Sequence, residues 1–322
     1  MGDGKIEGSF VVGWSSGTEV GFSADGTTHA GLLLSESTLF PPLCTVKPFV
    51  AALLLSQIVD DVGGVRWSSV KGCASPVSLL DLLAHDSGIA EVSSQLVRVA
   101  DDGWRREVLG SLTVGGERMY TEYSGYAAAT RAVELVCGSD FRLLSRSGGI
   151  LSRPWDQADW VLTGSCVDVT VPYMEVGGYL VPILGEIAPV SLRGWNPSFG
   201  GLVSVRDLVE FGESLLSRGE ALAPSVIRYL LEQRGERRWD PTLNRTMAFT
   251  AGFFLVGGSD WFGRTLTDQA VGICGAGGTS FLMVDPGLEL VVAGFFELAV
   301  DEPMVNRRRD VIETVVADGG YL

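Results

Sequence analysis

The stretch that decides the fold is Leu39-Phe40-Pro41-Pro42-Leu43-Cys44-Thr45-Val46-Lys47-Pro48-Phe49-Val50-Ala51-Ala52. Apolar spacing that continues beyond it predicts a helix over residues 45–62. If this helix begins near Cys44, Lys47 lies one turn further on the same face, so the thiol and the amine can meet. The helix N-terminus and the ammonium both favour the thiolate form, which makes Cys44 a candidate nucleophile. An isolated Cys-x-x-Lys is more often an inert buried thiol beside a surface cation, so the rest of the sequence must decide.

The composition narrows the classes of function. The chain has 322 residues, which predicts two domains or one domain with a large insertion. Its 24 Lys+Arg against 39 Asp+Glu give a net charge of −15, which disfavours nucleic acid or an anionic membrane as a partner. With two histidines, a Ser-His-Asp triad or a multi-histidine metal site has almost no raw material, so we expect no metal and no cofactor.

Lysine and cysteine are also informative. Lysine occurs at just three positions, Lys5, Lys47 and Lys71, which draws attention to Lys47. The five cysteines are an odd number without Cys-x-x-Cys spacing, which indicates reduced thiols (positions 44, 73, 137, 166 and 274). Residues 1–7 lack the features of a signal peptide, and no apolar run reaches ~18 residues. We therefore expect a cytoplasmic protein without a membrane partner.

The order of the expected elements predicts an α+β fold. The alternating pattern predicts a β-hairpin from residues 9–14 and 19–23, and helices are expected in the middle of the chain. Long loops are expected across residues 138–200. A strand meander and a final helix are expected at the end of the chain. We expect an antiparallel sheet built from both chain ends and flanked by helices, with residues 1–62 and 245–322 forming this α/β sandwich domain and residues 63–244 a mostly helical, loop-rich inserted domain. The remaining expected elements are helices at 81–84, 125–136, 204–216 (Ser204 as N-cap, Asp207 at N3) and 303–316, and strands at 248–256, 279–284 and 288–296 around an Asp285-Pro286-Gly287 turn.

Three ordered segments carry a family resemblance. Residues 39–52 resemble the S-x-x-K nucleophile motif, residues 77–88 (VSLLDLLAHDSG) resemble D-L-L-x-H-x-S-G, and residues 200–208 (GGLVSVRDL) resemble G-G-L-x-S-x-x-D-L. All three are typical of the serine β-lactamase and penicillin-binding-protein superfamily, particularly its class C β-lactamase and esterase branch. The resemblance implies a β-lactamase-like fold in which Cys44 stands where the family has its nucleophilic serine. It also implies that His85 is structural and not a base.

The second catalytic element of that family, Tyr-x-Asn, is not kept in this chain. Anchoring residues 119–129 on Gly125-Tyr126 puts Thr121 at the tyrosine and Tyr123 at the asparagine. A local shift would let Tyr120 or Tyr123 supply a phenol that relays protons between Lys47 and the reacting groups. The alternative is that both tyrosines line the pocket.

The third element, the strand motif Lys/His-Thr-Gly, is also altered. The match places Ile273 at the cation and Gly275 at the glycine, so we expect both to contact substrate. The resemblance implies an oxyanion hole made by the backbone N–H groups of Cys44 and Ala276, which needs no particular side chain. Strand alternation then points Cys274 into the core.

These departures indicate acyl transfer. An isoleucine at position 273 cannot hold a substrate carboxylate, which disfavours β-lactam hydrolysis, and an acyl-cysteine is a thioester that reacts with amines more readily than with water. The leading hypothesis is an amide-forming acyltransferase that takes an acyl or aminoacyl group from an acyl or peptidyl carrier protein, or from coenzyme A, onto Cys44 and passes it to a small-molecule amine, in natural-product (antibiotic) biosynthesis. The alternatives are an esterase or amidase of the same fold and a catalytically degraded binding protein. Arg307-Arg308-Arg309 is a candidate docking cluster for the carrier, with a solvated face as the alternative.

Overall fold

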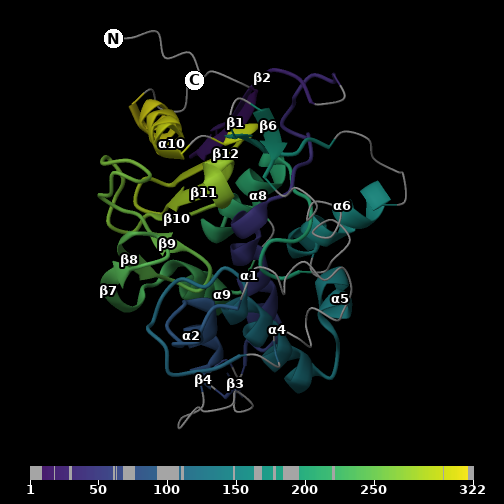
Figure 1. The fold of residues 1–322 in the computed structure, drawn as a ribbon, viewed down its shortest axis with the longest axis vertical. Helices are drawn as coiled ribbons and strands as arrows, with labels where there is room; N and C mark the ends of the chain where they lie inside the picture. The colour runs from purple at the N-terminus through teal and green to yellow at the C-terminus, as the bar shows by residue number, and fades with distance from the viewer. Residues whose placement is uncertain are drawn as a thin grey trace.

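The computed structural model describes residues 9–17, 19–28, 31–60, 62, 64–67, 77–92, 109, 112–147, 149–162, 169–176, 179–183, 196–219, 222–299 and 301–317. The expectations for Lys5, Lys71, Cys73 and Cys166 lie outside these residues. Figure 1 shows a sheet, with helices α8 and α10, above a helical lobe that contains α2 and α4. Helix α1 runs from the sheet toward this lobe.

The large sheet has the strand order β2-β1-β12-β11-β10-β9-β8-β7. Neighbouring strands are antiparallel throughout, and β1 pairs with β12 in the register Phe10↔Phe296, so both ends of the chain contribute to one sheet, as predicted. The strands are β1 (Phe10–Ser16), β2 (Glu19–Asp25), β7 (Arg234–Asp240), β8 (Arg245–Phe249), β9 (Phe254–Leu255), β10 (Val271–Cys274), β11 (Ser280–Asp285) and β12 (Leu290–Phe296).

Two smaller sheets and the helices complete the described structure. One small sheet joins β13 (Leu298–Ala299), β5 (Tyr173–Val176) and β6 (Tyr179–Pro182), and the other pairs β3 (Arg66–Trp67) with β4 (Val77–Ser78). The α-helices are α1 (Lys47–Gln57), α2 (Leu79–Leu83), α4 (Ser124–Cys137), α5 (Phe141–Leu144), α6 (Arg153–Leu162), α8 (Val205–Leu215), α9 (Pro224–Leu231) and α10 (Asp301–Ala317). The 3-10 helices are η1 (Leu43–Val46), η3 (Ser145–Ser147), η4 (Gly149–Leu151) and η6 (Ala276–Gly278).

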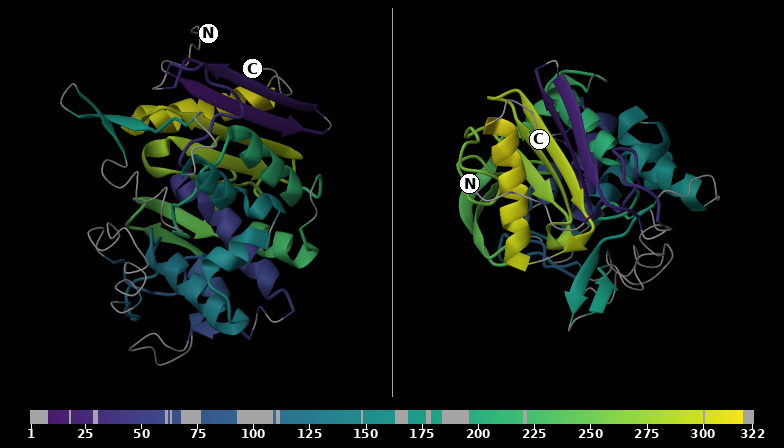
Figure 2. Two further views of the ribbon diagram at one scale, coloured as in Figure 1. Left: turned by 90° about the vertical axis from the view of Figure 1, so that its right-hand side faces the viewer. Right: turned by 90° about the horizontal axis from the view of Figure 1, so that it is seen from above.

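Helices cover both faces of the large sheet. Helix α8 packs against β1, β11 and β12, whereas α10 packs against β12 and η6. Seen from above in Figure 2, α10 lies on one side of the sheet and α8 lies on the other. Helix α1 is buried along most of its length, because it is enclosed between α4, α9 and the rest of the core. A buried α1 places the residues at its start inside the molecule, between the sheet and the helical lobe.

Local signals predicted several elements correctly. The β1–β2 hairpin is confirmed, and α8 begins with the expected capping box, in which Ser204 and Asp207 bond to each other's backbone N–H groups. The prediction of long loops across residues 138–200 is wrong, because α5, α6 and the β5–β6 hairpin form there. The sheet also extends past the predicted boundary at residue 245, since β7 pairs with β8.

None of the helices in the described part of the chain combines the length and the apolar character that crossing a bilayer requires.

Candidate active site

Cys44 lies on a constrained turn that leads into α1. It is half-buried in η1, directly after Leu43, whose φ of 53° falls in the left-handed region that favours glycine. Ser280 of β11 holds this turn on both sides of Cys44. Its hydroxyl donates to the carbonyl oxygen of Pro42 at 2.8 Å and lies 2.9 Å from the hydroxyl of Thr45. The sheet therefore fixes the position of the thiol through the residues beside it.

Lys47 is fully buried one turn after Cys44. Its Nζ donates a hydrogen bond to the carbonyl oxygen of Ser198 at 3.1 Å. The same atom lies 5.2 Å from the ring centroid of Tyr120 and 5.5 Å from that of Tyr126, so the amine sits among aromatic rings. The hydroxyl of Tyr126 donates to the carbonyl oxygen of Leu83 at 3.3 Å.

Tyr120 is a buried phenol that interacts with Cys44. Burial, followed by the proximity of Cys44, raises the pKa of Tyr120 well above its usual value. The backbone of Tyr120 is clamped by the β7–β8 turn: its N–H donates to Asp240 at 2.5 Å and its carbonyl oxygen accepts from the Thr242 hydroxyl at 3.0 Å. Asp240 is fully buried. Tyr120 is therefore a protonated phenol held against the thiol.

Tyr123 lies nearby in a more open setting. It is half-buried at the start of α4, where its N–H donates to Glu91 at 3.1 Å and its carbonyl oxygen accepts from the Ser198 hydroxyl at 3.1 Å. Burial, followed by the neighbouring carboxylate of Glu122, raises the pKa of Tyr123. Ser198 therefore connects Tyr123 to Lys47.

Tyr120, the buried tyrosine of this segment, stands one position before the tyrosine position of the match that was anchored on Gly125-Tyr126. Thr121 occupies the place that the match gave to the tyrosine, but its hydroxyl lies 3.2 Å from His85 Nδ1 and accepts from the Gly125 N–H. The shift puts Glu122 where the pattern has asparagine.

His85 packs beneath Tyr120, with 4.5 Å between the ring centroids. Its Nδ1 accepts from the Thr121 N–H at 3.1 Å, and burial, followed by the charges of Lys47 and Arg238, lowers the pKa of His85 well below 6.5. A neutral, packed imidazole whose Nδ1 is already bonded supports the structural role that the resemblance implies.

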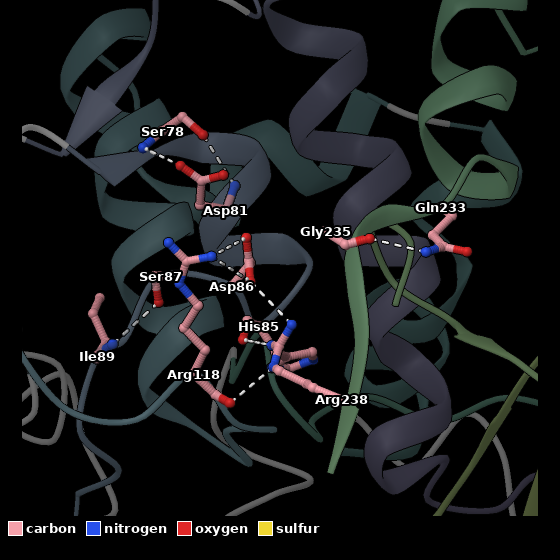
Figure 3. Close-up of polar contacts among 10 residues, drawn as sticks. All are labelled: Ser78, Asp81, His85, Asp86, Ser87, Ile89, Arg118, Gln233, Gly235 and Arg238. Carbon is pink, nitrogen blue, oxygen red and sulfur yellow. Dashed lines mark hydrogen bonds and ion pairs between the residues drawn. The ribbon is translucent and has the colours of Figure 1, made fainter. Parts of the chain in front are cut away.

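An ion-pair network joins the His85 segment to the sheet (Figure 3). Arg238 on β7 donates to Asp86 at 3.0 Å, to the carbonyl oxygen of His85 at 2.8 Å and to that of Arg118 at 2.9 Å. Arg118 itself lies 3.4 Å from the Asp86 carboxylate. These contacts fix the imidazole on which Tyr120 rests.

The strand β10 presents the opposite side chain from the one expected. Ile273 is 1% exposed and belongs to the hydrophobic core, whereas Cys274 is half-buried and interacts electrostatically with Cys44 and Tyr120. The expected faces of Ile273 and Cys274 are therefore reversed. Adjacent residues of a strand face opposite sides, so with Ile273 in the core the side chain of Cys274 faces the other side.

Arg308 of α10 lies directly behind Cys274. It is 1% exposed, donates to the carbonyl oxygen of Trp261 at 2.9 and 3.2 Å, and stacks 4.2 Å from the ring centroid of Phe262. Burial raises the pKa of Cys274, while the charge of Arg308 opposes that shift. Arg308 is thus neither a docking residue nor part of a solvated face.

The two predicted oxyanion-hole donors lie on neighbouring segments. Gly275 is so close to the Cys44 turn that a Cβ built on it would lie 3.1 Å from the Pro42 carbonyl oxygen and 3.2 Å from the Leu43 Cβ. Ala276 follows it at the start of η6. Convergence of the Cys44 and Ala276 N–H groups on one oxygen stays a prediction, as does substrate contact by Gly275.

The fold that encloses this site is that of the β-lactamases and penicillin-binding proteins, which confirms the predicted fold class. The chain is similar to a β-lactamase from Mycobacterium bovis, with 16% identity over 97% of this chain and 96% of that one and a TM-score of 0.64. It is similar to EstCE1, a hydrolase with promiscuous acyltransferase activity, with 14% identity, coverage of 94% and 93% and a TM-score of 0.70. A simvastatin synthase (LovD) mutant from Aspergillus terreus shows 15% identity, coverage of 96% and 90% and a TM-score of 0.68.

No family model matches the chain, and no curated protein matches it in sequence. At 14–16% identity these structural similarities establish the fold.

Sequence reasoning missed four residues around the thiol. Tyr126 was used to anchor a motif without a role of its own, and Ser198 lies in the stretch expected to be loops. Asp240 stands before Pro241 at the end of a strand that was not expected. The burial of Arg308 could have been predicted from the helical spacing. Arg308 lies on the same face of its helix as three apolar residues that are buried, Val311, Ile312 and Val315.

Proposed function

We propose that the protein is a cysteine-dependent acyltransferase that forms an amide through acyl-Cys44. The observation that carries the proposal is the arrangement of a half-buried Cys44, a buried Lys47 one turn later and a buried phenol, Tyr120, whose ring centroid lies 5.2 Å from the Lys47 Nζ. The proposed donor is a thioester of an acyl or peptidyl carrier protein or of coenzyme A, and the proposed acceptor is a small-molecule amine. Natural-product assembly is the setting in which such a pair of substrates meets.

In the first half-reaction the Cys44 thiol loses its proton toward Lys47, with the Tyr120 hydroxyl between them as the relay. Sγ then attacks the thioester carbonyl carbon, the new C–S bond forms, and the old C–S bond breaks as the donor sulfur takes the proton back from Lys47 through Tyr120 and leaves as a thiol. Backbone N–H groups of Cys44 and Ala276 are the proposed donors to the tetrahedral oxyanion.

In the second half-reaction a neutral amine attacks the acyl-Cys44 carbonyl carbon. The C–N bond forms, the C–S bond breaks, and the proton from nitrogen returns to Sγ through Tyr120. The high pKa of Tyr120 supports this role, because a phenol that stays protonated can donate to the departing sulfur. Exchange between two thioesters is close to thermoneutral, so the energy of the donor is kept until the amide forms.

Hydrolysis of a thioester or ester is the second candidate function. It is favoured by the similarity to EstCE1, which combines hydrolase and acyltransferase activity in this fold. The two candidates differ in whether water or an amine takes the acyl group from Cys44.

The test is intact-protein mass spectrometry of the wild type and Cys44→Ala after incubation with a panel of acyl thioesters, followed by product analysis with and without amines. We expect one acyl group on the wild type, none on Cys44→Ala, and amide formation that exceeds acid release when amine is present. Acid release that is unchanged by amine would favour the hydrolase. Absence of any acyl-enzyme would favour a binding protein.

A further inference from the structure

A small β-hairpin projects from the body of the molecule, away from the candidate active site. Strands β5 and β6 form it, and both views in Figure 2 show it extending beyond the rest of the fold. Its base is fixed, because the Tyr173 N–H donates to the carbonyl oxygen of Glu297 at 2.7 Å and β5 pairs with β13. The hairpin is therefore fastened at its base to the segment that follows β12.

Both faces of this hairpin are apolar and open to solvent. Adjacent residues of a strand face opposite sides, yet Tyr179, Leu180 and Val181 of β6 are 76%, 64% and 40% exposed. Met174 and Val176 of β5 are 39% and 53% exposed. An apolar surface that the molecule leaves uncovered on two faces indicates contact with another molecule.

Strand β6 also has a free edge. In the order β13-β5-β6, no described strand pairs with the outer side of β6. The Ile183 N–H donates to the Pro172 carbonyl oxygen, so this pair is hydrogen-bonded, and by alternation Pro182 and Leu180 turn their backbone groups away from β5. Because Pro182 has no N–H, Leu180 is the residue of β6 that offers both a donor and an acceptor at the edge.

The distribution of charge favours a second copy of the chain as the occupant of this edge. The net charge of −15 makes two copies repel each other over most surfaces. Among residues 173–176 and 179–182, the single charged residue is Glu175, on β5. If the β6 strands of two copies paired, the two Glu175 backbones would lie three strand spacings apart, about 14 Å, which exceeds the screening length of about 8 Å in physiological salt.

We infer that two copies of the chain associate through β6, antiparallel across a two-fold axis at Leu180. Such a pair is self-complementary, since each Leu180 N–H donates to the carbonyl oxygen of the partner's Leu180. Tyr179 of each copy lies opposite the partner's Val181, so apolar side chains that one copy leaves in solvent are covered. The contact is smaller than a standard interface of about 1,600 Å², so the dimer forms reversibly and its population depends on concentration. The association does not depend on acyl transfer.

The test is sedimentation velocity of the full chain from about 1 µM to about 100 µM. Leu180→Glu places two carboxylates opposite each other at the two-fold axis. Leu180→Pro removes the outward N–H and leaves the hydrogen bonds between β6 and β5 in place. Leu143→Glu, at a residue of α5 that is 58% exposed, is the matched control. The melting temperature at the lowest concentration checks that each variant folds.

We expect the dimer fraction of the wild type to rise with concentration, and both Leu180 variants to raise the dimer dissociation constant about tenfold or more. Leu143→Glu should leave that constant unchanged. Hydrogen exchange gives an independent readout, because the Leu180 amide should exchange rapidly in the monomer and be protected in the dimer.

A wild type that stays monomeric at every concentration would overturn the association through β6. A dimer that persists in Leu180→Glu, without protection of the Leu180 amide in the wild type, would place the contact on another surface and overturn it as well.

Discussion

The two walls of the site are built on different chemistry. The wall formed by α1 and residues 120–126 surrounds a lysine with aromatic rings and hydroxyl groups, which suits proton movement. The wall formed by β10 and α10 contains the Cys274 thiol and the buried Arg308. Two N–H groups of Arg308 donate hydrogen bonds to the carbonyl oxygen of Trp261. From this difference we expect the rate of acyl transfer to depend on the wall of α1 and residues 120–126. We expect the free energy of unfolding to depend on the wall of β10 and α10.

Loss of the nucleophile should have the largest effect. Cys44→Ala should abolish acyl transfer, and Cys44→Ser should leave weak activity shifted to higher pH, because the same base generates an alkoxide less readily. Turnover with a model thioester and intact mass measure both. Turnover at the wild-type rate by Cys44→Ala would contradict the covalent mechanism. It would also contradict the assignment of the chemistry to the wall of α1 and residues 120–126.

Removal of the buried amine comes next. Lys47→Ala should lower kcat/KM about 10²-fold or more, the range of a lost general base. Alkylation of Cys44 by iodoacetamide should be slower in this variant, because the ammonium that favours the thiolate is gone, and an unchanged melting temperature separates loss of the base from loss of the fold. A loss below about threefold would mean that the proton leaves by another route.

Substitution of the two tyrosines tests which phenol relays the proton. Tyr120→Phe removes the hydroxyl that we propose as the proton relay and should lower kcat about 10-fold or more. Tyr123→Phe leaves that hydroxyl in place and should change kcat less than Tyr120→Phe does. The reverse order of the two effects would assign the relay to Tyr123.

The second wall should respond in stability and not in chemistry. Arg308→Ala leaves the Trp261 carbonyl oxygen without its donors and opens a cavity beside Phe262, so unfolding in urea should become easier by about 2–4 kcal/mol. Arg307→Ala is the matched control on the same helix and should stay within about 0.5 kcal/mol. Cys274→Ser should retain most of the acyl-transfer rate. A hundredfold rate loss in Cys274→Ser would place chemistry on this wall.

His85 should give the smallest effect, through pH. Its pKa is lowered in the folded state, so below about pH 6.5 the unfolded chain binds a proton that the folded protein does not. The free energy of unfolding should therefore fall as pH drops through 6.5 toward 5. His85→Gln should flatten this part of the profile in urea titrations at several pH values. A profile identical to the wild type would show that other groups cause the acid sensitivity.

Sequence reasoning was accurate where a motif coincides with a local structural rule. Cys44 and Lys47 are tied by a single helical turn, and Ser204 and Asp207 by one capping box, so neither pair needs distant information. The motif match did not give the correct position of the tyrosine where the chain is neither helix nor strand. Residues 117–121 are not helical, so an anchor on Gly125 did not determine which tyrosine reaches the thiol.

The prediction of which β10 side chain faces the site was wrong for a related reason. The match there was anchored on Gly278-Thr279-Ser280, beyond the end of the strand, and the turn η6 between them breaks the alternation. Arg308 escaped prediction because the groups that bury it, Trp261 and Phe262, are contributed by a distant part of the chain.

The burial of Arg308 also sets an order of events during synthesis. Cys44 and Tyr120 leave the ribosome well before α10, which follows β12 in the chain. Until α10 has emerged and docked, Trp261, Phe262 and Cys274 lack the guanidinium that fills the space between them. A nascent chain that has not yet made α10 therefore lacks the side chain that completes the packing between Trp261 and Phe262.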